Sequence, residues 1–240
     1  MKQIQPDIWQ TEVENPAKGL YTHAYLLLRD DGNVLFYNTS HIDEIERMAA
    51  LGGVARQYIS HRDELGDSLN TVAERFGAEL GGHVRELEEF TKFRRPTILF
   101  ERREIHLGNI EVIPTPGHSP GSTCFYVNPP HGKRYLFTGD TLWFSGNKVL
   151  EAAFLSNSDV DAYVKSLEML RELEPDFVIS SATGGHDGYS EIAPGEWPGL
   201  IDHALERLMA RQSNIGAESY RLTVFSHAPA ALIDCLRTNG

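Results

Sequence analysis

Three short apolar runs in this sequence each lead into side chains that bind divalent metal ions. These side chains are His61 and Asp63 after residues 57–59, His118 after residues 110–113, and Asp140 after residues 134–137. Zinc, iron and manganese accept imidazole nitrogens and carboxylate oxygens, and ligands gathered from several strand ends leave an open position for catalysis. The pattern therefore indicates an open metal site built from the ends of several strands.

The loop that carries His118 has the most distinctive sequence of the three. Residues 115–122 read TPGHSPGS, in which Pro-Gly and Pro-x-Gly turns follow directly on a predicted strand. Such turns stiffen a loop, and functional residues are common on loops above a rigid scaffold. A single loop histidine is more often a solvated or capping residue. The prediction of a site thus depends on the three segments together.

The elements around these segments alternate between strands and helices. We expect strands at residues 7–13, 21–28, 34–37, 57–59, 98–100, 104–107, 110–113, 122–127, 135–137 and 176–181, and helices at 42–51, 69–76, 160–173 and 201–209. The strands alternate or are continuously apolar, and the helices repeat apolar residues at helical spacing. Two groups of strands, each followed by helices, predict an α+β sandwich of two mixed sheets with helices on the outer faces.

The three segments resemble motifs of the metallo-β-lactamase superfamily. HRDELGDS at the end of a strand is similar to the family's HxHxDH motif, and PGHSPGS and FTGD follow in the family's order, within residues 24–188. The resemblance implies a four-layer αββα sandwich. It also implies that His61 and His118 bind metal and that Asp140 bridges two metals.

The sequence departs from the family pattern at three positions. Asp63 stands where the family has its second histidine, and Asp67-Ser68 replaces the Asp-His pair after a two-residue insertion. The place of the last histidine reads Ser181-Ala182-Thr183, and His186 follows in a glycine-rich loop. Asp67 could instead be an ordinary helix N-cap, and His186 an ordinary loop residue.

These departures determine the metal content that we expect. One ion would be bound tightly by His61, Asp63, His118 and Asp140. A second, weak or absent, would rely on Asp140, Asp67 and His186. Zinc is the first expectation, with iron or manganese as alternatives.

The composition is typical of one globular domain over residues 1–240, with 41% hydrophobic residues and a net charge of −12. No basic run exceeds two residues, so we expect no nucleic-acid partner. We also expect no membrane span and, because the N-terminal residues lack a signal peptide's apolar core, a cytoplasmic location. Cys124 and Cys235 form no CxxC pair. The sequence leaves the oligomeric state open.

The leading functional prediction is hydrolysis of a small-molecule ester, thioester or lactone by metal-activated water. Asp140 would lie beside the attacking water, and Asp67 would act as general base or proton carrier. Two alternatives remain. One is a non-catalytic binding protein that keeps the scaffold with a degenerate site, and the other is a mononuclear iron enzyme that oxidises thiols.

Overall fold

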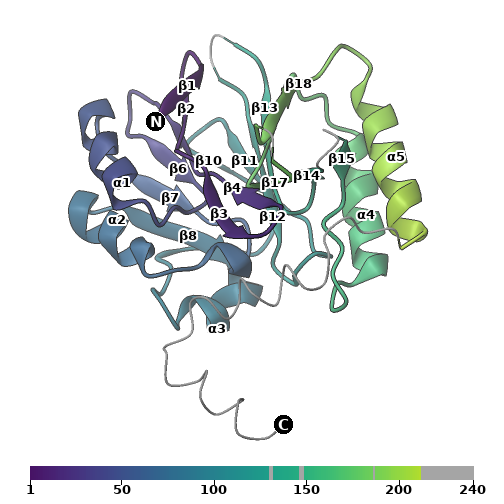
Figure 1. Cartoon of the computed structure of the whole chain (residues 1–240), viewed down its shortest axis with the longest axis horizontal. Helices are drawn as coiled ribbons and strands as arrows, with labels where there is room; N and C mark the ends of the chain where they lie inside the picture. The colour runs from purple at the N-terminus through teal and green to yellow at the C-terminus, as the bar shows by residue number, and fades with distance from the viewer. Residues whose placement is uncertain (130–131, 146–148, 186, 212–240) are drawn as a thin grey trace, which may run out of the picture.

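The computed structural model describes residues 1–129, 132–145, 149–185 and 187–211, which fold into two large mixed sheets and one smaller sheet (Figure 1). The first sheet has the order β1 (Lys2–Gln5), β2 (Ile8–Gln10), β5 (Tyr25–Leu27), β6 (Val34–Phe36), β7 (Arg56–Tyr58), β8 (Glu79–His83) and β9 (Ile98–Phe100). The pairs β1–β2, β2–β5 and β5–β6 are antiparallel. The pairs β6–β7, β7–β8 and β8–β9 are parallel.

The second sheet has the order β10 (Glu104–His106), β11 (Ile110–Pro114), β12 (Thr123–Val127), β13 (Tyr135–Gly139), β16 (Phe177–Ser180) and β18 (Tyr189–Glu191). Only the β13–β16 pair is parallel among these described strands. The smaller sheet contains β15 (Leu150–Glu151), β14 (Trp143–Phe144), β17 (Ala182–Thr183), β4 (Leu20–Thr22) and β3 (Glu14–Ala17).

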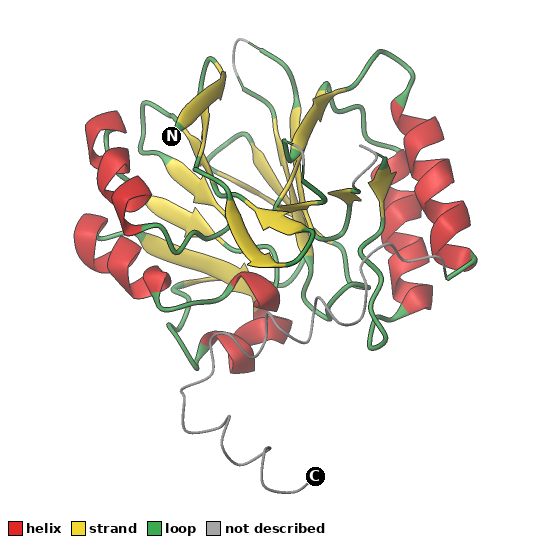
Figure 2. Ribbon diagram, in the orientation of Figure 1, coloured by secondary structure: helices red, strands yellow, loops and turns green. Residues whose placement is uncertain are grey.

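Helices cover the outer faces of the two large sheets (Figure 2). On one side lie α1 (Ile42–Met48) with the 3-10 turn η1 (Ala49–Leu51), and α2 (Ser68–Phe76); the short α3 (Leu87–Phe90) follows the turn η3 (Val84–Glu86). On the other side lie α4 (Val160–Arg171) and α5 (Trp197–Met209). The predicted αββα sandwich is therefore confirmed. Among the described residues, no helix is both long and apolar enough to cross a membrane.

The main core lies between the two large sheets. Phe36 of β6 and Phe137 of β13 stack with ring centroids 3.9 Å apart, and both side chains are fully buried. A second core packs α4 and α5 against the other face of the second sheet. Burial of large aromatic side chains is the main favourable term that holds such layers together. This packing fixes the end of β7 relative to the end of β13. The predicted ligands His61 and Asp63 follow β7, and Asp140 follows β13.

The segment 21–28, predicted as one strand, is two strands in different sheets. Leu20–Thr22 forms β4 in the smaller sheet, and Tyr25–Leu27 forms β5 in the first sheet, so the prediction was wrong. His23 and Ala24 make the crossing between them. A continuous apolar run reports burial but does not determine which neighbours its two halves pair with. This break brings His23 close to the candidate site.

Candidate metal centre

Each of the four predicted ligands lies just beyond a strand. His61 and Asp63 follow β7, and Asp63 lies in the 3-10 turn η2 (Arg62–Glu64). His118 lies in the loop between β11 and β12, and Asp140 follows β13 directly. The first pair therefore comes from the first sheet and the other two from the second. The sandwich brings together side chains that are far apart in the sequence.

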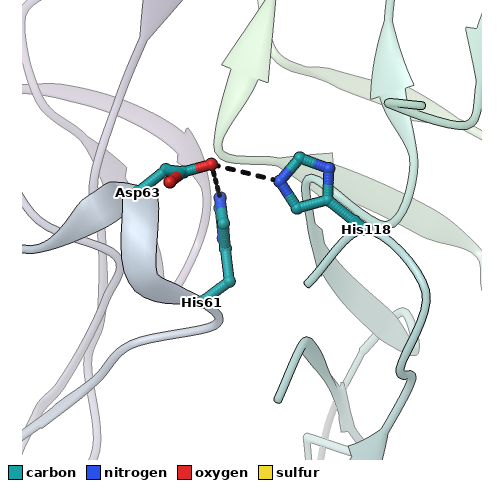
Figure 3. A group of neighbouring side chains, drawn as sticks. All are labelled: His61, Asp63 and His118. Atoms are coloured by element: carbon teal, nitrogen blue, oxygen red, sulfur yellow. Dashed lines mark hydrogen bonds and ion pairs between the residues drawn. The ribbon is translucent and has the colours of Figure 1, made fainter. Parts of the chain in front are cut away.

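Figure 3 shows three of these side chains, His61, Asp63 and His118, pointing toward one another. Oδ2 of Asp63 lies 3.8 Å from Nε2 of His61 and 3.3 Å from Nε2 of His118. Oδ2 of Asp140 lies 3.4 Å from Nε2 of His61 and 4.0 Å from Nε2 of His118. Ligand bonds of about 2.0–2.1 Å in a tetrahedron separate the ligand atoms by about 3.3 Å. These contacts are close to that spacing, so a small divalent ion fits among them after minor adjustment.

The tautomer of His118 gives a chemical test of this fit. Its Nδ1 lies 2.6 Å from the carbonyl oxygen of Ala153, which can only accept a hydrogen bond, so Nδ1 carries the proton. In the neutral ring, Nε2 then presents a lone pair to Oδ2 of Asp63 at 3.3 Å. Two acceptors at that distance need a cation between them, either a proton or a metal ion.

His61 is oriented in the same way by its own neighbours. Ser60 Oγ donates to Oε1 of Glu64 at 2.5 Å, so it is the acceptor for Nδ1 of His61 at 2.9 Å. Nε2 of His61 is buried and makes no hydrogen bond to any described residue. A carboxylate behind a ligating histidine, reached here through Ser60, is a common way of fixing ring orientation in metal sites. Both imidazoles therefore direct Nε2 to the same point, where the carboxylates of Asp63 and Asp140 lie.

Asp140 is held by a hydrogen bond from the opposite side. Ser181 Oγ donates to Oδ1 of Asp140 at 2.6 Å, which leaves Oδ2 facing the histidines. Gly139 has φ +54°, and a Cβ there would lie 2.1 Å from Ser60 Oγ. Only glycine allows β13 to approach the His61 segment so closely.

The pKa values of these residues reflect their mutual charges. Burial would raise the pKa of Asp140, but the charges of His61 and His118 and the Ser181 hydroxyl hold it well below its usual value. Burial likewise opposes ionisation of Asp63, yet its contact with His118 lowers its pKa. Burial lowers the pKa of His61, and the charges of Asp140 and Glu64 outweigh that effect and raise it well above normal. The two carboxylates are ionised, so the site attracts a cation.

A cavity of about 350 Å³ opens beside this cluster. Its walls include His61, Asp63 and Asp140 from the cluster and, from other segments, Glu14, Leu20, His23, Asn38, Thr39, Ile42, Leu65, Asp67, Ser68 and Ala182. The volume is in the range of small-molecule sites. The cluster therefore lies where a ligand of modest size can reach it.

The structure brings together only part of the predicted second site. Within the described part of the chain, the group of side chains that could hold a metal ion consists of His61, Asp63 and His118, and Asp140 contacts both histidines. Asp67 is exposed on the cavity wall, at the N-cap position of α2, where its side chain accepts no capping hydrogen bond. Ser68 donates to Asn38. His186 lies outside the described residues.

Sequence reasoning did not find His23. It is 7% exposed, lies on the cavity wall, and its backbone N–H donates to the carbonyl oxygen of Ser181 at 3.1 Å. It is thus next to the position where the family has its last histidine. Nothing in the local sequence indicates this, because His23 interrupts what reads as a strand.

The fold is an αββα sandwich, and a cluster of histidine and aspartate side chains lies at the ends of its strands. A model of the metallo-beta-lactamase superfamily matches residues 48–182, and the chain belongs to that superfamily. The resemblance seen in the sequence is thereby confirmed. A search of curated protein sequences found no match.

Solved structures with the same fold are distant in sequence. A metallo-beta-lactamase from Pontibacter korlensis has 16% identity and a TM-score of 0.66, covering 87% of this chain and 97% of its own. An archaeal metallo-beta-lactamase superfamily protein from Sulfolobus tokodaii has 17% identity and a TM-score of 0.63, covering 92% and 95%. A B3 metallo-beta-lactamase described as having an active-site glutamic acid has 16% identity and a TM-score of 0.57, covering 87% and 91%. At these identities, the likeness establishes the fold alone.

Proposed function

We propose that this chain is a metal-dependent hydrolase of a small-molecule ester, thioester or lactone. The observation that carries the proposal is the convergence of two imidazole Nε2 atoms and two ionised carboxylates at one side of a cavity. This donor set suits zinc first, and iron or manganese as alternatives. When bound, such an ion lowers the pKa of water and polarises the oxygen of a scissile bond.

The residues around the cluster have separate roles in this proposal. His61, Asp63, His118 and Asp140 hold one ion, and Glu64 and Ser181 keep His61 and Asp140 in place. The carboxylate of Asp67 is exposed on the cavity wall and takes up the proton that water loses during attack. Its exposure then lets it release that proton to solvent.

His23 supplies a hydrogen-bond acceptor for the substrate. Its Nδ1 donates to the carbonyl oxygen of Thr11 at 3.0 Å, and burial lowers its pKa, so the ring is neutral with an unprotonated Nε2. Among the described residues no hydrogen bond reaches that Nε2, and the ring lines the cavity. A substrate with an O–H or N–H group near the reacting bond matches this acceptor.

Size and charge favour a small substrate. The cavity of about 350 Å³ has room for a small organic molecule, and Leu20, Ile42 and Leu65 give it apolar wall area. A net charge of −12 disfavours a polyanionic partner such as RNA. Both features support an uncharged or weakly charged ester, thioester or lactone.

We propose that one ion binds tightly and that a second binds weakly or not at all. Asp63 and Ser68 replace imidazoles of the family motif, and a serine hydroxyl is a much weaker ligand than imidazole. A carboxylate in the active site has a parallel in the B3 relative whose description names an active-site glutamic acid.

Elemental analysis of protein purified without chelator or affinity-tag metal tests the proposal. The expected result is about one zinc, iron or manganese per chain, lost in His118→Ala, and hydrolysis in a screen of esters, thioesters and lactones. If the protein contains iron and oxidises thiols in the presence of oxygen, it is a mononuclear iron enzyme and not a hydrolase. Two histidines and a carboxylate also suit mononuclear iron. If the protein binds no metal, even after metal ions are added, the remaining explanation is a non-catalytic binding protein.

A further inference from the structure

Glu86 is a buried carboxylate that lies between the two loops that carry the metal-binding histidines. It is 1% exposed and ends the turn η3, so it belongs to neither loop. Its Oε2 accepts from Nε of Arg62 at 2.5 Å. Its Oε1 accepts from Ser119 Oγ at 2.7 Å and from the backbone N–H of Gly121 at 2.6 Å. One oxygen therefore serves each loop.

The partners of Glu86 are direct neighbours of the ligands. Arg62 stands between His61 and Asp63, and Ser119 follows His118. The two loops come from different sheets, so their separation is not set by the pairing of neighbouring strands. A backbone hydrogen bond from Thr123 N–H to the carbonyl oxygen of Ser60, at 3.0 Å, links them at one point. Glu86 adds a link through side chains, beside the ligands themselves.

The His118 loop is shaped to receive this carboxylate. A Cβ at Gly121 would lie 2.6 Å from Cγ of Glu86 and 3.0 Å from its Oε1. Real Cβ atoms essentially never lie within 3.0 Å of such an atom, so a side chain at position 121 would force Glu86 to shift. The second glycine of PGHSPGS is thus explained by contact with Glu86.

We propose that Glu86 is a positioning residue that fixes the separation between the His61–Asp63 segment and the His118 loop, and thereby sets the affinity for the divalent ion. The inference rests on the proposed metal site. It adds a role for a residue outside the ligand set. Residues that orient ligands in this way typically change metal affinity about 10- to 100-fold when altered.

Glu86→Gln is the sharpest test, because it keeps the shape of the side chain. An amide has one acceptor oxygen, and its NH2 group would face either the Arg62 guanidinium or the Gly121 N–H. Whichever way the amide turns, one loop loses its acceptor and meets a donor instead. The variant therefore breaks the link and leaves little change in volume.

Glu44→Gln is a matched control on the outer helix α1. Glu44 is also 1% exposed and also has three donors: the Met1 amino group at 2.9 Å, the Glu12 N–H at 2.9 Å and Arg47 Nη1 at 2.6 Å. None of these donors neighbours a metal-binding residue in the sequence. Loss of stability is expected in both variants, and loss of metal affinity only in Glu86→Gln.

The first experiment measures zinc affinity of the full chain, without an N-terminal tag, by competition with a chromophoric chelator. We expect zinc to bind roughly tenfold more weakly to Glu86→Gln than to wild type, and less than about twofold more weakly to Glu44→Gln. Equal affinities in the two variants would overturn the proposal. The melting temperatures of both variants show whether their stability losses are comparable.

The second experiment is amide hydrogen exchange of the metal-free chain, which does not depend on zinc uptake. We expect faster exchange in Glu86→Gln in two segments together, residues 60–65 and 116–122, and no such paired change in Glu44→Gln. An increase confined to residues around position 86 would overturn the proposal. If wild type takes up no ion, the proposed function fails, and exchange alone then decides whether Glu86 links the loops.

Discussion

Nε2 of His118 lies 3.3 Å from Oδ2 of Asp63, while Nδ1 of the same ring donates to the carbonyl oxygen of Ala153. Nε2 of a histidine that follows a strand of one sheet thus faces a carboxylate that follows a strand of the other. In the metal-free protein a proton must bridge them, and in the loaded protein the proposed ion replaces it.

Replacement of His118 by alanine is expected to remove the ion. The variant loses one of two imidazoles and leaves Asp63 facing an empty space, so zinc affinity falls by more than roughly 100-fold. Zinc per chain after dialysis, measured by elemental analysis, checks this. Full retention of zinc in His118→Ala would mean that the ion binds elsewhere.

The stability of the metal-free protein should depend on pH through His61. Burial lowers its pKa, but the charges of Asp140 and Glu64 raise it above the unfolded value, so its contribution is fully present below about pH 6.5. That contribution is lost as pH rises through the folded pKa, by up to about 1.4 kcal/mol per pH unit for one proton. Chemical denaturation of chelator-treated protein from pH 6 to pH 9 should show the decline.

Asp140 gives the opposite dependence at acid pH. Its pKa is lowered, against the effect of burial, by His61, His118 and Ser181. Its contribution to stability is present above about pH 3.9, the ordinary pKa of an aspartate, and is lost as pH falls through the folded value. In Asp140→Asn the alkaline decline should be smaller, because His61 loses its strongest partner. An unchanged profile would contradict this coupling.

Asp67→Asn tests whether the carboxylate of Asp67 carries a proton or only occupies the N-terminal end of α2, where it makes no capping hydrogen bond. If Asp67 carries the proton, kcat should fall by roughly 100-fold with zinc content unchanged. Asparagine is accepted at helix N-termini about as well as aspartate, so a residue with only that position would tolerate the change. The measurement is kcat on the best substrate of the ester, thioester and lactone screen.

His23→Phe should weaken substrate binding and leave the ion in place. Phenylalanine fills a similar volume but offers no acceptor at the position of Nε2, and loss of one hydrogen bond of about 1–1.5 kcal/mol raises KM about tenfold. His23→Gln, which keeps an acceptor, should recover part of the loss. A fall in zinc content of His23→Phe would instead indicate that His23 supports the metal site.

The sequence alone predicted the candidate ligand set, because its signals are local and its motifs resemble those of the superfamily in type and order. An apolar run that ends in a glycine or proline turn indicates a strand end, and the residue types found there, His61, Asp63, His118 and Asp140, indicate metal ligation. The same local patterns predicted α4, which the structure has at Val160–Arg171. These features depend on residues within a few positions of one another.

Only the tertiary structure decided how the ends of these strands come together. It placed His23 beside Ser181 by dividing one predicted strand between two sheets. It also placed Glu86 between two loops, where its partners Arg62 and Ser119 are 24 and 33 positions away in the sequence. It also left Asp67 on the cavity wall, outside the ligand cluster. Local periodicity reports burial and turn chemistry, whereas contacts between distant segments depend on which sheet each strand joins and on how the two sheets pack.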